Sequence, residues 1–236
     1  MTLREPVNPH SPNRDRLLRD FESIFRKARP LLVTRFDKTT TIEISDETHR
    51  EYEALIPKIP YVGDKEPFTR FIISTAQYLA LYRVLQNHGL SLEEVGQLIY
   101  AITDRLLTAY PQFLLRFLSG SVFSDKYIQK VRKGAEESQR REYPGDYVFS
   151  FVEGDGVDFD YGVDYTECGV CKFLEAEGAP ELAPYVCTSD VIFSDKLGWG
   201  LRRTMTIAEG YSICDFRFKK GGKTNVASGV LHKNSA

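Results

Sequence analysis

The sequence predicts an α+β protein, with an N-terminal helical layer packed on a small antiparallel β-sheet and two short helices in a Cys-rich C-terminal half. Two changes along the chain predict this fold. The composition changes near Pro144-Gly145, since all four cysteines and 12 of the 17 glycines lie from Gly145 onward. The periodicity changes at the same point, from apolar residues at helical spacing to apolar residues that alternate with their neighbours.

The 236 residues are enough to bury a sizeable core without disulfides or metals. No internal repeat and no low-complexity segment is visible in the chain. We expect residues 17–222 to form one compact domain. The expected parts are a flexible N-terminal arm over 1–16, a mainly helical region over 17–144, a Cys-rich α+β region over 145–222 and a loose tail over 223–236.

Apolar spacing and stop signals predict four helices in the first half. Gly89 is a typical C-terminal stop, and Ser91 with Glu94 forms a capping box. The last of the four has charges of both signs, which predicts a solvent-exposed face. The predicted helices run from 17 to a stop at Pro30, over 68–88, from 91 to just before Pro111, and over 124–143.

In the second half the pattern is typical of a hairpin followed by mixed elements. Gly154-Asp155-Gly156 supplies the turn residues of the hairpin. Thr166 stands where an N-cap would precede a helix, and Pro180 is well placed to open another. The expected elements are strands over 147–152 and 157–163, a helix from Thr166 to Gly178, a helix from Pro180 to Asp190, and strands over 201–208 and 212–218.

Charge and hydropathy exclude several classes of protein. The net charge is −2, with 31 Lys and Arg against 33 Asp and Glu and no basic stripe, which argues against a nucleic-acid partner. The apolar runs are far shorter than the roughly 18 residues that cross a bilayer, and Met1–Arg16 lacks the apolar centre of a secretory signal. We therefore expect a cytoplasmic protein with a small-molecule substrate, no cofactor, and no nucleic-acid or membrane partner. The sequence is compatible with a homo-oligomer.

The strongest functional signal is the clustering of Cys168, Cys171, Cys187 and Cys214. Cys168-x-x-Cys171 supplies one half of a zinc knuckle, but Cys187 and Cys214 have no close Cys or His partner. A dithiol redox role would require a thioredoxin-like βαβ context, which the preceding hairpin does not resemble. Cysteines also often only fill a core. We expect no metal site, with metal binding, redox activity and packing as the competing interpretations.

A nucleophilic cysteine needs a populated thiolate, which a neighbouring positive group usually provides. All four histidines lie outside the Cys-rich window, so the sequence does not support a Cys–His dyad. Arg203, one strand from Cys214, could supply the positive charge. Asp190 or Glu167 could move protons if burial raised its pKa, and Asp190 lies three residues after Cys187, on the same face of a helix.

Four segments of the second half carry these residues. They are Thr166-Glu167-Cys168, Cys187-Thr188-Ser189-Asp190, Arg203-Thr204-Met205-Thr206-Ile207-Ala208-Glu209-Gly210 and Cys214-Asp215-Phe216. In order and spacing they resemble the L-2-amino-thiazoline-4-carboxylic acid hydrolase family. The resemblance is close over these segments and loose over the helical half, and Cys171 is an extra cysteine relative to the family pattern.

The resemblance implies a Cys-dependent hydrolase that acts on the carbon–nitrogen bond of a cyclic C=N or related compound, as in opening a 2-aminothiazoline carboxylate to S-carbamoyl cysteine. A thiolate would attack the electrophilic ring carbon, an acidic group would hold the amidinium, and a cation would receive the carboxylate. The implied catalytic residues are Cys214 as first choice of nucleophile, Cys187 as second, and Asp190; the implied substrate-binding residues are Arg203, Cys168, Thr206, Glu167 and Asp215.

Two other functions stay open at this point. The Cys-rich half also faintly resembles sensor domains related to the vinyl-reductase type, which bind a small molecule without changing it. The same Cys and Asp set could also serve a hydratase or isomerase with a bulkier substrate, which the aromatics between Tyr61 and Phe123 would suit. Turnover that disappears when Cys214 or Cys187 becomes Ser would favour an enzyme over a sensor.

Overall fold

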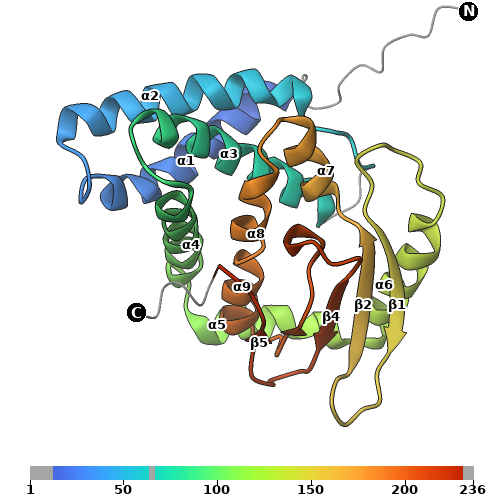
Figure 1. Ribbon diagram of the computed structural model, residues 1–236. Coiled ribbons are helices and arrows are strands. Elements are labelled where there is room, and N and C mark those ends of the chain that lie inside the picture. The colour runs from blue at the N-terminus through green and yellow to red at the C-terminus, as the bar shows by residue number, and fades with distance from the viewer. Residues whose placement is uncertain (1–12, 64–66, 231–236) are drawn as a thin grey trace, which may run out of the picture.

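The computed structural model describes residues 13–63 and 67–230 of the 236. Most of the arm expected over 1–16 therefore lies outside the described residues, and the first helix begins at Arg14. The described residues form an α+β fold in which the helices come first and most strands follow Tyr147 (Figure 1). The fold class predicted from the sequence is confirmed.

The first half is a layer of helices joined by short 3-10 turns. Helix α2 packs against α1 and α3, and α4 packs against α1 and α3 (Figure 1). Their fully buried residues, such as Leu32, Ile44, Leu79 and Ile99, form one continuous core. The elements are α1 (Arg14–Leu32), α2 (Lys38–Leu55), η2 (Ile56–Lys58), α3 (Phe68–Asn87), α4 (Leu92–Thr108), α5 (Gln112–Ser119), η3 (Gly120–Phe123) and α6 (Asp125–Ser138).

Helices α3 and α4 begin and end close to the predicted positions. The predicted capping box forms, since the Glu94 N–H donates to the Ser91 hydroxyl at 3.3 Å and the Ser91 N–H donates to the Glu94 carboxylate at 2.9 Å. The stop at Pro30 was wrong. A proline in the last turn removes one hydrogen bond, and α1 continues two residues further to bury Leu32 completely. Helix α6 ends at Ser138, short of the predicted 143.

The sequence pattern did not predict α2. Asp37 caps it by accepting a hydrogen bond from the Thr40 N–H at 2.9 Å. Its buried face is Ile44, Thr48 and Tyr52, at a spacing of four residues, but Thr and Tyr are only weak markers of a core. Because about half of the buried face of α2 is polar, the apolar residues of this segment do not recur at clear helical spacing, and the helix was missed.

The sheet has the strand order β1-β2-β4-β3-β5 in the described residues. All neighbouring pairs are antiparallel except β3 with β5, so the sheet is mixed rather than purely antiparallel. The predicted hairpin is β1 paired with β2, and β4 joins the other edge of β2. The strands are β1 (Val148–Glu153), β2 (Tyr161–Glu167), β3 (Arg202–Arg203), β4 (Cys214–Phe218) and β5 (Asn225–Val226).

Two strands differ from their predicted extents because a carboxylate takes the backbone N–H groups. The Asp155 carboxylate accepts from the N–H groups of Val157, Asp158 and Phe159, so β2 begins at Tyr161 and not at Val157. Asp215 accepts from the N–H groups that follow β3, which ends that strand at Arg203 instead of 208. Residues 225–226, which the sequence placed in the tail, form β5.

Between β2 and β3 the chain forms short helices that lie between the helical layer and the strands (Figure 1). Thr166 is in β2, so the predicted N-cap is wrong and Cys168 occupies that position. The single helix expected from Pro180 is broken, because the Thr188 and Ser189 hydroxyls donate to the carbonyls three residues earlier. The elements between β2 and β3 are α7 (Gly169–Ala176), η4 (Pro180–Leu182), α8 (Ala183–Val186) and α9 (Ser189–Leu197), and a further short helix, η5 (Ile207–Glu209), follows β3.

The two layers meet through aromatic side chains. Phe68 at the start of α3 stacks on Tyr147 with ring centroids 4.5 Å apart, and it also contacts Phe149 and Tyr165 from the hairpin. Helix α6 covers β1, where Ala135 packs with Phe149. No helix within the described ranges combines the length and the apolar character needed to cross a membrane.

Candidate active site

The fold brings the four cysteines together from the start of α7, the end of α8 and the start of β4. Cys168 follows β2 as the N-cap of α7, Cys171 lies one turn into α7, Cys187 ends α8, and Cys214 opens β4. Each of the four feels the charge of other members, and Cys214 lies opposite Tyr165 in the pairing of β4 with β2. We call these four residues the thiol cluster. All four are free cysteines.

Cys168 is the member of the thiol cluster with a stabilised thiolate. A hydrogen bond from the Cys171 thiol, together with the backbone N–H groups of Cys171 and Val170, holds the pKa of Cys168 below its ordinary value. Burial and the negative charge of Asp190 act in the opposite direction without reversing the shift. Cys168 is also the N-cap of α7, where the positive end of the helix dipole favours a thiolate.

The other three thiols are held in the protonated form. Burial raises the pKa of Cys214 to about 12, although the Ile207 N–H donates to its sulfur at 3.2 Å. Burial and the nearby Asp190 raise the pKa of Cys187 well above its ordinary value. The hydrogen bond to the Cys168 thiolate is the main cause that raises the pKa of Cys171. Cys168 is therefore the member of the thiol cluster whose thiol gives up its proton most readily.

A buried ion pair lies beside the thiol cluster. Arg203 on β3 is 1% exposed, donates to the Asp190 carboxylate on α9, and approaches the Cys187 carbonyl at 3.5 Å. Its guanidinium carbon lies 5.4 Å from the centre of the Phe216 ring. Burial raises the pKa of Asp190 even though Arg203 favours the carboxylate. Asp190 is thus suited to exchange a proton, and the Nε of Arg203 has no hydrogen-bond partner among the described residues.

Tyr147 and Tyr165 complete the cluster and were not predicted as site residues. The Tyr147 hydroxyl is buried without a hydrogen-bond partner in the described part of the chain, and its pKa is raised by burial and by Cys168, Tyr165 and Cys187. Burial and Asp190 likewise raise the pKa of Tyr165. Strand alternation pairs Tyr147 with the inward-facing Phe149. A hydroxyl on a face that points into a core was the sequence signal available for it.

Three of the predicted substrate-binding residues hold local structure. The Thr206 hydroxyl accepts from the Glu209 N–H and caps η5, and it is 1% exposed. The Asp215 carboxylate accepts from the Thr204 hydroxyl at 2.6 Å as well as from backbone N–H groups. Glu167 is paired with Arg141 and Lys172, whose hydrogen bonds lower its pKa. Substrate contacts by Thr206, Asp215 and Glu167 stay predictions.

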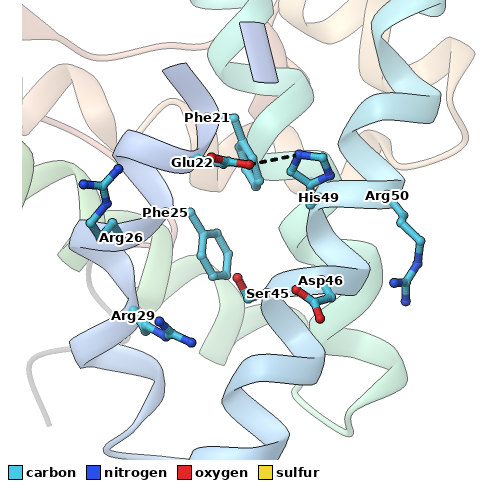
Figure 2. Close-up of a pocket in the computed structure, with 9 residues that line it drawn as sticks. All are labelled: Phe21, Glu22, Phe25, Arg26, Arg29, Ser45, Asp46, His49 and Arg50. Atoms are coloured by element: carbon cyan, nitrogen blue, oxygen red, sulfur yellow. Dashed lines mark ion pairs between the residues drawn. The ribbon is translucent and has the colours of Figure 1, made fainter. Parts of the chain in front are cut away.

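The described residues contain no group of three or more His, Cys, Asp or Glu side chains arranged to hold a metal ion. A separate pocket of about 420 Å³ lies between α1 and α2 (Figure 2). Phe21 and Phe25 line it, and the His49 ring lies 3.4 Å from the Glu22 carboxylate. No site residue expected from the sequence lines this pocket, so the candidate site is the thiol cluster with Asp190 and Arg203.

The arrangement supplies the groups that acyl and amidine chemistry needs. Cys168 provides a nucleophile, Asp190 a proton carrier, Arg203 a cation, and Tyr147 a free hydroxyl. These groups come from four different elements within the second half of the chain. Burial makes their mutual interactions stronger than they would be at the surface.

Comparison with known proteins gives a match to a protein family. A family model described as L-2-amino-thiazoline-4-carboxylic acid hydrolase matches residues 70–218, which include the whole thiol cluster, Asp190 and Arg203. The match begins inside α3 and so leaves out α1 and α2. No curated protein and no solved structure matches the chain.

Proposed function

Because the chain belongs to the L-2-amino-thiazoline-4-carboxylic acid hydrolase family, whose model matches more than half of its length, we propose that it is a thiol-dependent hydrolase that opens a cyclic amidine. The observation that supports the thiol is the stabilised thiolate of Cys168 beside the buried Asp190–Arg203 pair. A thiolate is a far better nucleophile than the protonated thiol, so the hydrolase family and this local charge point to the same chemistry.

We assign the attack to Cys168 rather than to Cys214. The resemblance made Cys214 the first choice and Cys187 the second, but burial keeps both protonated near pH 7. Cys168 has donors on its sulfur, and it is partly exposed where Cys214 is buried. A partly exposed thiolate can meet a substrate without a prior proton transfer.

The first step of the proposed reaction forms a covalent intermediate. The Cys168 sulfur bonds to the amidine carbon of the ring, and the bond from that carbon to the ring nitrogen breaks. The nitrogen leaves as an amine after it takes a proton from the Asp190 carboxyl. Burial raises the pKa of Asp190, which favours this residue as the group that carries the proton.

The second step releases the product with one water. Asp190, now a carboxylate, takes a proton from a water molecule whose oxygen bonds to the same carbon. The bond from that carbon to the Cys168 sulfur then breaks, which restores the thiolate. The sum is the addition of one water to the ring compound, and for a 2-aminothiazoline carboxylate the product is S-carbamoyl cysteine.

Two buried groups without partners in the described residues are available to hold the substrate. The Nε–H of Arg203 can donate to a carboxylate, and the Tyr147 hydroxyl can bond the exocyclic nitrogen of the amidine. A buried donor without a partner costs free energy in the empty protein, and a bound substrate that pairs it recovers that cost. The same two groups would therefore favour a small polar ring over a purely apolar ligand.

The test uses the reduced protein with 2-amino-thiazoline-4-carboxylate, following the loss of the ring compound and the gain of product by chromatography and mass spectrometry. We expect turnover that Cys168→Ser abolishes and Cys214→Ser retains. The opposite result would return the attack to Cys214, and turnover in both variants would remove the thiol from the mechanism. A ligand that binds and comes back unchanged would favour the sensor interpretation.

A further inference from the structure

We propose that Cys168 and Cys171 are a redox-active dithiol, which a peroxide oxidises to a disulfide across the first turn of α7. This is a modification site in its own right. Its formation requires only the two thiols and the oxidant, and so does not depend on the proposed hydrolase activity.

The local fold supplies the context that the sequence pattern did not indicate. Strand β2 ends at Glu167, Cys168 is the N-cap, and α7 begins at Gly169. A Cys-x-x-Cys segment at the junction from a strand to a helix places its first sulfur at the positive end of the helix. The strand is antiparallel to its neighbours, but the stabilisation of the sulfur depends only on the helix that follows it.

The two sulfurs are within reach of each other. The Lys172 N–H donates to the Cys168 carbonyl at 3.0 Å, so Cys168 is in register with the helix. Helix geometry puts Cα atoms three residues apart at about 5 Å, inside the range of about 4.4–6.8 Å that disulfides span. The Cys171 thiol already donates to the Cys168 sulfur. Forming the bond therefore requires side-chain rotation rather than movement of α7.

The charges divide the two thiols into an attacking and a resolving partner. The Cys168 thiolate attacks one oxygen of the peroxide, the O–O bond breaks, and the sulfur becomes a sulfenic acid as water or an alcohol leaves. The Cys171 sulfur then bonds to the Cys168 sulfur, which releases water. The two thiols lose two hydrogens and two electrons in total, and the peroxide gains them.

The resolving step is helped by the loss of charge in the first step. The thiolate of Cys168 is the main cause that keeps Cys171 protonated. Once Cys168 is an uncharged sulfenic acid, that cause is gone, and the pKa of Cys171 falls to the level that burial and the neighbouring thiols set. Cys187 and Cys214 keep their protons mainly through burial, which the oxidation does not change, so they resolve Cys168 more slowly.

Oxidation would also switch off the reaction proposed above, because the disulfide removes the attacking thiolate. This consequence rests on the proposed function. A dithiol reductant would break the disulfide and restore the thiolate. The disulfide and the loss of hydrolysis can therefore be measured separately.

The test is peptide mapping of the full chain after one equivalent of hydrogen peroxide, with remaining thiols alkylated before digestion with trypsin. The sequence suits this test, since cleavage after Arg141 and Lys172 leaves Cys168 and Cys171 in one peptide, while Cys187 and Cys214 fall in two others. We expect peptide 142–172 to be lighter by two hydrogens and to carry no alkyl group. The peptides with Cys187 and Cys214 should each be alkylated.

Cys171→Ser is the matched variant, because its hydroxyl can still donate to the Cys168 sulfur. We expect excess peroxide to carry Cys168 of this variant through sulfenic acid to sulfinic acid, which dithiothreitol does not reverse, whereas the unmodified chain treated in the same way recovers both thiols. Two reduced thiols in peptide 142–172 of the peroxide-treated chain, or a disulfide from Cys168 to Cys187 in its place, would overturn the proposal. A chain that forms this disulfide on oxidation but, once reduced, does not hydrolyse the cyclic amidine would instead count against the proposed function alone.

Discussion

Asp190 on α9 and Arg203 on β3 form an ion pair whose guanidinium side is almost completely buried, with Arg203 1% exposed. The pair ties the helix that follows Cys187 to the strand that precedes the Cys214 loop. The negative charge of Asp190 acts on three members of the thiol cluster. It raises the pKa values of Cys187 and Cys214, and it opposes the lowering of the pKa of Cys168.

Breaking this pair from one side should destabilise the fold strongly. We expect Arg203→Met to lower the free energy of unfolding by about 1–3 kcal/mol, because it leaves the half-buried Asp190 without its cation. The double variant Arg203→Met with Asp190→Leu should recover most of the loss, since no buried charge remains. Urea denaturation of the unmodified protein, the single variant and the double variant measures the loss of stability and its recovery. A double variant as unstable as the single one would show that the pair stabilises through packing rather than charge.

The thiolate of Cys168 should titrate below an ordinary cysteine. We expect the rate of its alkylation by iodoacetamide to reach half of its maximum below about pH 8.5, the ordinary thiol value, because donors hold the pKa of Cys168 down. Cys171→Ala removes the largest of these effects and should move the midpoint to higher pH. Asp190→Asn removes an opposing charge and should move it to lower pH. Shifts of the same sign in both variants would contradict the assignment of charges.

The elements that were predicted well from the sequence are those whose ends are set by residues only a few positions apart. The capping box of Ser91 and Glu94 and the turn residues around Gly154 act within a few positions, so the start of α4 and the hairpin could be predicted. The sequence placed the four cysteines within one window of the chain but did not show which of them approach one another. Helix α2 was missed because its period depends on Thr48 and Tyr52, which become core residues only through packing against α1 and α3.

Which cysteine has the lowered pKa depends on tertiary contacts, and the spacing of residues along the sequence does not show those contacts. The family resemblance favoured Cys214, and Arg203, one strand away, was a candidate cation for it. In the structure Arg203 is paired with Asp190, and burial raises the pKa of Cys214 to about 12. Cys168 has its stabilised thiolate because β2 runs through Thr166 and the helix therefore starts two residues later than predicted. A shift of two residues in one helix start thus changes which thiol carries the charge.

The Tyr147 hydroxyl allows stability and function to be separated. It is buried without a hydrogen-bond partner among the residues described, so Tyr147→Phe should leave the free energy of unfolding unchanged or raise it by about 1 kcal/mol. If the hydroxyl bonds the substrate, the same variant should lose about tenfold to hundredfold in kcat/KM for the cyclic amidine. Thermal unfolding tests the expected stability of Tyr147→Phe, and steady-state kinetics test the expected loss of kcat/KM. Unchanged kinetics would remove Tyr147 from the site.

Gly169 fixes the start of α7 against the rest of the fold. A Cβ at this position would lie 2.4 Å from the Gly145 carbonyl oxygen and 2.8 Å from the Tyr147 ring, which is closer than side chains pack. We expect Gly169→Ala to cost about 1–3 kcal/mol of stability and to slow the alkylation of Cys168, because the N–H groups that stabilise its thiolate must move with the helix.

Gly134 in α6 is the matched control for this substitution. A Cβ there would meet only the Phe149 ring, at 3.4 Å, and an alanine inside a helix is favoured over glycine by about 0.5–1 kcal/mol. Gly134→Ala should therefore be neutral or stabilising and should leave Cys168 reactivity unchanged. If Gly169→Ala destabilised the protein and yet left the alkylation rate at its original value, the first turn of α7 would not be what stabilises the thiolate, and the basis for choosing Cys168 over Cys214 would be lost.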